Sequence, residues 1–185
     1  MISQHFLDEA VRQLRKLKSQ ADKALAQTKD DHLFLTLDDE SNSIAIVMKH
    51  MAGNMRSRWT DFLTTDGEKP GRNRDGEFVD SFTSRAELLD YWNSGWRRLF
   101  DTLAGLSADD LAATVTIRGE PHSVPLAIQR SVAHCAYHVG QIILIARILA
   151  GENWTTITIP RGASTSFNQQ IWGAGHYQTK NPEQT

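Results

Sequence analysis

The stretch that most constrains the fold is a long apolar segment, residues 124–150, VPLAIQRSVAHCAYHVGQIILIARILA. On a helix, at about 100° per residue, it forms one continuous apolar seam of Ile128, Cys135, Val139, Ile142, Ala146 and Leu149. Only Arg130 and Arg147 are typical surface residues, whereas an outer helix of a globular protein would show a charged face. The segment therefore predicts a central helix that is buried on most of its circumference.

A second stripe on the same predicted helix is polar and contains two histidines, since it consists of Ser131, His134, His138 and Gln141. Histidines four residues apart lie one above the other on a helix face, and neutral imidazole is the commonest protein metal ligand. Two hydrogen-bonded histidines in a core or dimer interface would give the same pattern. Gln141 continues the stripe, and such a stripe costs free energy unless a partner satisfies it. The stripe therefore favours a metal site beside a cleft.

Three further segments have apolar residues at helical spacing and predict helices over residues 2–27, 43–64 and 84–104. Ser84 and Glu87 form a capping box at the start of the third of them. Four helical segments with little strand predict an all-α fold, a four-helix bundle over residues 1–150. Two short segments around RGEP, residues 114–117 and 122–124, predict a small hairpin before the last helix.

Residues 151–185 differ in composition, with Gly, Ser and Asn and few apolar anchors. Residues 154–159 alternate with threonines and are compatible with one extended strand. We expect this segment to form an extended C-terminal tail that packs on the bundle, held by Phe167, Ile171 and Trp172, with its last residues disordered.

The second predicted helix repeats the pattern of the last one, because His50 lies near its apolar seam on a stripe with Gly53, Asn54 and Ser57. Alone, His50 would be an ordinary polar residue, but with the other pair it supplies a third imidazole. The loop over residues 65–82 follows this helix. It is either a solvated loop or a lid near the cleft, in which Arg72 or Arg74 is available for an anionic group.

Composition excludes several classes of protein. The net charge of −2 and the absence of a basic face argue against nucleic acid as a partner. The single Cys135 excludes an intramolecular disulfide framework and suits a reducing cytosol. The amphipathic N-terminus lacks the apolar core of a signal peptide, and Arg147 interrupts the best candidate for a membrane span. We expect a cytoplasmic protein with a small-molecule substrate and no membrane partner.

Small residues line the back of the last predicted helix, at Ala133, Ala136 and Gly140. They let another backbone approach closely, and the first and third helices cannot together cover every face of the bundle. We therefore expect a homodimer in which helix faces of two subunits meet across a two-fold axis, the commonest oligomer symmetry.

The pattern of His50 on the second helix and His134-Cys-Ala-Tyr-His138-Val-Gly-Gln141 on the fourth resembles the DinB-like superfamily over about residues 1–150. With the tail motif IPRGASTSFNQ, it is similar to a largely uncharacterised subgroup of YfiT-like metal-dependent proteins. The resemblance implies an up-down-down-up four-helix bundle, usually a homodimer. It also implies three histidine ligands, matching His50, His134 and His138, for a divalent transition metal such as zinc or nickel. Some relatives are S-transferases or isomerases that use bacillithiol, mycothiol or glutathione.

Three neutral imidazoles leave at least one position open on a four-coordinate ion, as in catalytic sites. That position can hold water or a thiol, and a metal ion activates both as nucleophiles. Asn54 and Gln141 are candidates for orienting imidazoles or substrate. We expect a metal-dependent S-transferase or hydrolase. The alternatives are a non-catalytic metal-binding stress or sensor protein and a metal-free dimeric bundle. No catalytic residue, thiol or native metal follows from the pattern.

Overall fold

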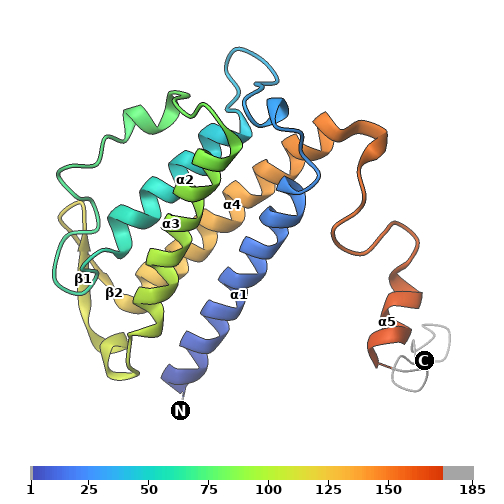
Figure 1. The fold of residues 1–185 in the computed structure, drawn as a ribbon. Helices are drawn as coiled ribbons and strands as arrows, with labels where there is room; N and C mark the ends of the chain where they lie inside the picture. The colour runs from blue at the N-terminus through green and yellow to red at the C-terminus, as the bar shows by residue number, and fades with distance from the viewer. Residues whose placement is uncertain (1, 173–185) are drawn as a thin grey trace. The chain divides into compact units, whose positions relative to one another are not determined.

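Four long helices make up most of the first of two units into which the contacts divide the chain, Met1–Asn153 and Trp154–Thr185. The computed structural model describes residues 2–172. The helices are α1 (Ile2–Leu25), α2 (Ile44–Trp59), α3 (Arg85–Ala104) and α4 (Val124–Ala150). They lie side by side, with α1 and α4 running upward and α2 and α3 downward in Figure 1. The described chain is therefore mostly helical, and its sheet has two strands.

Serine side chains cap three of these helices at their starts. Ser43 Oγ accepts from Ile46 N at 3.2 Å, and Ser84 and Ser123 make the same contact three residues ahead, at 3.2 and 3.3 Å. The end of α2 is less well predicted, because the helix stops at Trp59 instead of residue 64. The backbone of Thr60 is extended, and Asp61 has a φ of 46°, which no helix continues through.

Packing is tightest around α2, which contacts both α3 and α4 and is buried along nearly its whole length. Where α2 meets α3, a Cβ on Gly95 would lie 2.7 Å from the Cα of Ala52, so only glycine allows this approach.

The prediction that the last helix is buried on most of its circumference is wrong. One side of α4 packs on α1 and α2, but the other exposes large apolar side chains of Leu126, Tyr137, Leu144 and Ile148.

This exposed apolar side also affects the membrane prediction. By length and hydropathy alone, the helical stretch Val124–Asn153 would be able to cross a membrane, in spite of Arg147. The core helix of a soluble protein passes the same test, and α4 packs against two neighbouring helices. The length and hydropathy of this helix are therefore only weak evidence for a membrane span.

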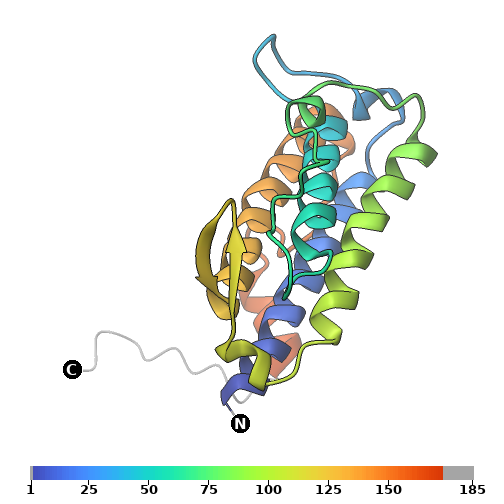
Figure 2. The same ribbon diagram turned by 90° about the vertical axis from the view of Figure 1, so that its left-hand side faces the viewer.

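The loop between α2 and α3 is anchored at both of its ends. Near its start, Asp66 accepts from the backbone N–H groups of Arg118 and Gly119 at 2.8 Å each. These bonds tie it to the turn of the hairpin formed by β1 (Thr114–Ile117) and β2 (Glu120–Ser123), which lies beside the helices in Figure 2. Further on, Lys49 Nζ donates to the carbonyls of Gly76 and Val79, around the short 3₁₀ helix η2 (Asp75–Phe78). The loop is thus held against α2.

The second unit contains the helix α5 (Ser164–Trp172). The predicted extended tail is therefore wrong over this segment, and residues 154–159 form no strand. Strand residues need a partner strand for their backbone hydrogen bonds, and no described strand pairs with this segment. The backbone of α5 instead makes hydrogen bonds within its own segment, as in the first turn, where Phe167 N donates to Ala163 O at 2.9 Å. Residues 173–185, the predicted disordered end, lie outside the described residues.

Candidate metal centre

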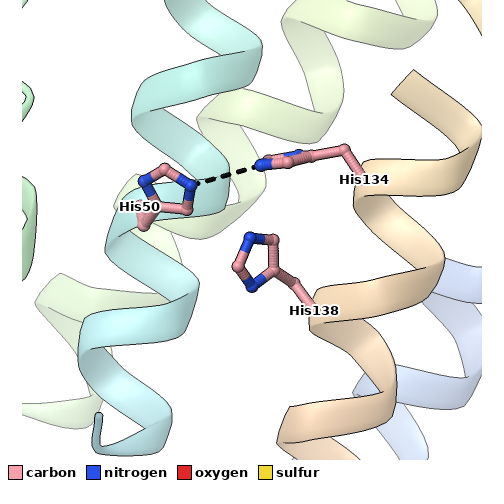
Figure 3. A group of neighbouring side chains, drawn as sticks. All are labelled: His50, His134 and His138. Carbon is pink, nitrogen blue, oxygen red and sulfur yellow. Dashed lines mark hydrogen bonds between the residues drawn. The ribbon is translucent and has the colours of Figure 1, made fainter. Parts of the chain in front are cut away.

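Three histidines from two helices point toward one another, as Figure 3 shows. His50 comes from α2 and is buried, whereas His134 and His138 come from successive turns of α4 and are half-buried. One ring nitrogen from each lies within 4.8 Å of the other two. The three imidazoles that the sequence singled out are therefore brought together, in a group that could hold a metal ion.

The spacing of the rings fits such an ion. Nitrogens at about 2.0–2.1 Å from a tetrahedral zinc ion lie about 3.3 Å from each other. His50 Nε2 and His134 Nε2 are 3.2 Å apart, which is the separation of two ligands on one ion. Zinc, copper and nickel bind histidine nitrogens well, whereas magnesium and calcium prefer oxygen ligands.

A buried carboxylate from the loop orients His50. Glu77, 4% exposed, accepts a hydrogen bond from His50 Nδ1 at 2.9 Å, which leaves Nε2 free as a ligand. Arg72 holds this carboxylate with two bonds of 2.8 Å, from Nε and Nη2. Gly53, one turn after His50, makes room for it, because a Cβ there would lie 2.2 Å from Glu77 Oε1. Arg72, Glu77 and His50 thus form a chain that fixes one ring.

The α4 side of the site is oriented locally. Nδ1 of His138 lies 2.7 Å from Oε1 of Gln141, three residues later on the same helix. Because an amide oxygen only accepts, Nδ1 carries the proton and Nε2 remains available as a ligand. Gln141, predicted to orient an imidazole, is placed to do so, although it does not line the pocket in front of the rings.

Burial favours the uncharged form of the two α4 imidazoles, His134 and His138. It lowers the pKa of His134 to about 3, and repulsion between protonated rings would lower this pKa further. Burial also lowers the pKa of His138, against the hydrogen bond to Gln141. Burial opposes ionisation of Glu77, but the hydrogen bonds from His50 and Arg72 outweigh it and lower the pKa of the carboxyl. Neutral imidazoles on α4 and an ionised Glu77 carboxylate are protonation states that favour metal binding.

The rings open into a pocket of about 430 Å³, within the size range of small-molecule sites. Three of the predicted substrate or orienting residues, Asn54, Arg72 and Arg74, line it. Asn54 is buried, and the Arg74 guanidinium lies over the Phe78 ring, 5.2 Å from its centroid. The Phe78 ring in turn lies 4.8 Å from that of His50.

Sequence reasoning missed several residues of this site, namely Glu77, Phe78, Arg58, Arg130 and Tyr137. Two signals in the sequence pointed to two of them, Glu77 and Arg58. Gly53 shares the stripe of His50 inside a helix, where glycine is unfavourable unless something approaches closely. Arg58 falls in the apolar seam of the same helix, at a position that predicts burial of a charged group.

Fold and site together define a mostly helical protein in which two packed helices present three histidines able to hold a metal ion. Residues 1–163 match a family described as "Protein of unknown function (DUF1572)", and the chain belongs to this family. No functionally curated protein matches the chain.

Proposed function

We propose that this chain is a metal-binding DinB-like protein, an up-down-down-up four-helix bundle that acts as a metal-dependent S-transferase or hydrolase. The observation that carries the proposal is the convergence of three ring nitrogens within 4.8 Å in the lining of a small-molecule-sized pocket. The ligands are His50, His134 and His138, and the ion is zinc or nickel. An ion held by three imidazoles supplies an open position at which water or a thiol is deprotonated more easily.

The protein's own groups supply rigidity and access. Glu77 and Arg72 hold the His50 ring, and Gln141 holds that of His138, so that little reorganisation is needed when an ion or substrate arrives. Asn54 is buried in the pocket wall, where its amide can orient a substrate. The substrate is a small molecule, and a low-molecular-weight thiol is the cosubstrate in the transferase case.

An activity assay on metal-loaded protein tests the catalytic part of this proposal. The protein is offered bacillithiol, mycothiol or glutathione with an alkyl halide, and separately an ester or amide without thiol. We expect turnover in one of these arms, with loss of turnover in His138→Ala. Metal bound at the three histidines with no turnover in any arm would instead support a non-catalytic metal-binding stress or sensor protein.

We further propose that the protein is a cytoplasmic homodimer whose subunits meet at the exposed side of α4. Tyr137 is 64% exposed there, beside the small residues Ala133, Ala136 and Gly140, and a Cβ on Gly140 would meet nothing within 4 Å. An apolar helix side of this kind marks an interaction surface. We expect a dimer in sedimentation at micromolar concentration and a monomer for Leu144→Arg. A wild-type monomer would end this part of the proposal.

A further inference from the structure

The pocket in front of the histidines carries an excess of positive charge. Five arginines line it: Arg58, Arg72, Arg74, Arg118 and Arg130. Glu77 pairs with Arg72, and Glu68 is shared between Arg72 at 3.0 Å and Arg118 at 3.4 Å. No ion pair among residues 2–172 includes Arg58, Arg74 or Arg130. Three of the five guanidinium groups thus lack a carboxylate partner within the described structure.

Arg58 is the most unusual of these cations, because it is only 8% exposed. Its Nε is buried without a hydrogen-bond acceptor in the described part of the chain. Gly67 packs closely on it, since a Cβ there would lie 3.3 Å from this nitrogen. Burial lowers the pKa of Arg58 to about 10, with further lowering from the nearby charges of Arg130 and Arg72. Arg58 thus has no ion-pair partner in the described structure, and the charge of Glu68 offsets the lowering of its pKa only in part. Since a buried cation without a partner destabilises a fold, an anion bound in the pocket would stabilise this arrangement.

Arg130 approaches the same pocket from α4 and is positioned by a neutral group. The Nδ1–H of the buried His122 donates to Glu120 O at 2.9 Å, which leaves His122 Nε2 as the acceptor for Arg130 Nη1. A neutral imidazole fixes the direction of the guanidinium without neutralising its charge. The arrangement keeps Arg130 available to an incoming anion.

We propose that Arg58 and Arg130 bind a carboxylate or phosphate group of the small molecule that occupies the histidine pocket. Arginine suits this task because its planar fork donates two parallel hydrogen bonds to either group. The inference rests on the proposed function only in placing this anionic group beside a metal-held reactant. It assigns the substrate, or the thiol cosubstrate, to the class of small organic anions.

A second basic groove, on the other side of the Arg72–Glu77 pair, provides the contrast. It is lined by Lys49, Arg56 and Lys69 and by the solvent-exposed Arg97 and Arg98. The first three of these cations have partners within the chain. Lys49 Nζ donates to two carbonyls and to Ser81 Oγ, Lys69 Nζ to Asp66 O, and Arg56 stacks over the Tyr91 ring. The exposed Arg56, two residues before Arg58 on α2, is therefore a matched control.

The test is a thermal melt of protein stripped of metal by a chelator, in sodium phosphate or sodium succinate against sodium chloride at equal ionic strength. At ten times the dissociation constant, an anion that binds only the folded state raises Tm by about 3–6 °C in a chain of this size. We expect this rise in phosphate, succinate or both, and the responding anion identifies the group. Arg58→Met and Arg130→Gln should lose most of the rise, and Arg56→Met should keep it.

The melt without either anion separates a binding role from a structural one. If Arg58 serves a ligand, Arg58→Met melts at or above wild type in chloride, because a buried charge is replaced by an apolar side chain. The inference is overturned if Arg58→Met melts far below wild type in chloride, if wild type shows no anion response, or if Arg58→Met and Arg56→Met respond alike. A metal titration of the same proteins is read separately. A chain that binds anion through Arg58 but binds no metal refutes the proposed function and leaves the anion site standing.

Discussion

The two helices that present the histidines hold them in different ways. On α2, His50 is fixed by Glu77, which lies 27 residues away in the chain and is itself clamped by Arg72. On α4, His138 is fixed by Gln141, within one turn of the same helix. The α2 side depends on a loop folding back onto the helix, whereas the α4 side needs only the helix. One half of the site is therefore preformed locally, and the other half is assembled by tertiary structure.

The largest expected effect is loss of a ligand from either side. His50→Ala and His138→Ala should both abolish tight metal binding, because two imidazoles hold a divalent ion far more weakly than three. The folded state should survive in His138→Ala, because the half-buried His138 lies outside the apolar core. We expect its Tm to lie within about 4 °C of metal-free wild type. Isothermal titration with zinc and a thermal melt measure the two quantities. A much lower Tm would make this histidine structural instead.

The next effect distinguishes the two orienting contacts. Glu77→Gln keeps the shape of the side chain but removes the charge that holds the His50 ring, and such changes typically weaken metal affinity about 10–100-fold. Gln141→Leu on the α4 side should weaken it less than tenfold, because the helix backbone alone brings His138 to the site. Competition with a chromophoric zinc chelator gives both constants. Equal losses in the two variants would contradict the difference between the two sides.

A smaller effect is expected from the space that α2 leaves for Glu77. Gly53→Ala puts a Cβ 2.2 Å from Glu77 Oε1, so the carboxylate must move, and both stability and metal affinity should fall. Gly95→Ala is the control, because its Cβ would clash with Ala52 at 2.7 Å, away from the site. This control should lower Tm yet leave the zinc affinity of the folded protein unchanged. A Gly53→Ala protein with wild-type affinity would show that Glu77 does not position the ligand.

The smallest effect is on the pH dependence of stability. The pKa of His134 is about 3 in the folded chain, and that of an unfolded histidine is about 6.5. Between these values the unfolded state binds more protons, so the metal-free protein loses stability as pH falls below about 6.5. Urea unfolding between pH 7 and pH 5, where carboxylates remain largely ionised, should show this slope in wild type. The slope should be shallower in His134→Asn, and an unchanged slope would contradict the burial effect.

Local signals in the sequence predicted much of this molecule. Apolar spacing, with the capping box at Ser84, located the four long helices, and the i, i+4 histidines with His50 located the candidate site. The partners that depend on loop folding were not predictable in the same way. Nothing near Glu77 in the sequence links it to His50, since the link is made by Lys49 and Asp66 holding the loop. The exposed side of α4 was mispredicted because apolar periodicity does not distinguish a buried apolar face from an exposed one.

The central claim, that three histidines hold one metal ion, is tested most directly by elemental analysis of protein purified without a nickel column. Wild type and His138→Ala are expressed and dialysed side by side, and their metal content is measured by mass spectrometry. We predict one equivalent of a divalent transition metal, zinc or nickel, per wild-type chain and almost none in the variant. Wild-type protein without metal, which also fails to take up added zinc or nickel, would contradict the claim, as would equal metal content in both proteins.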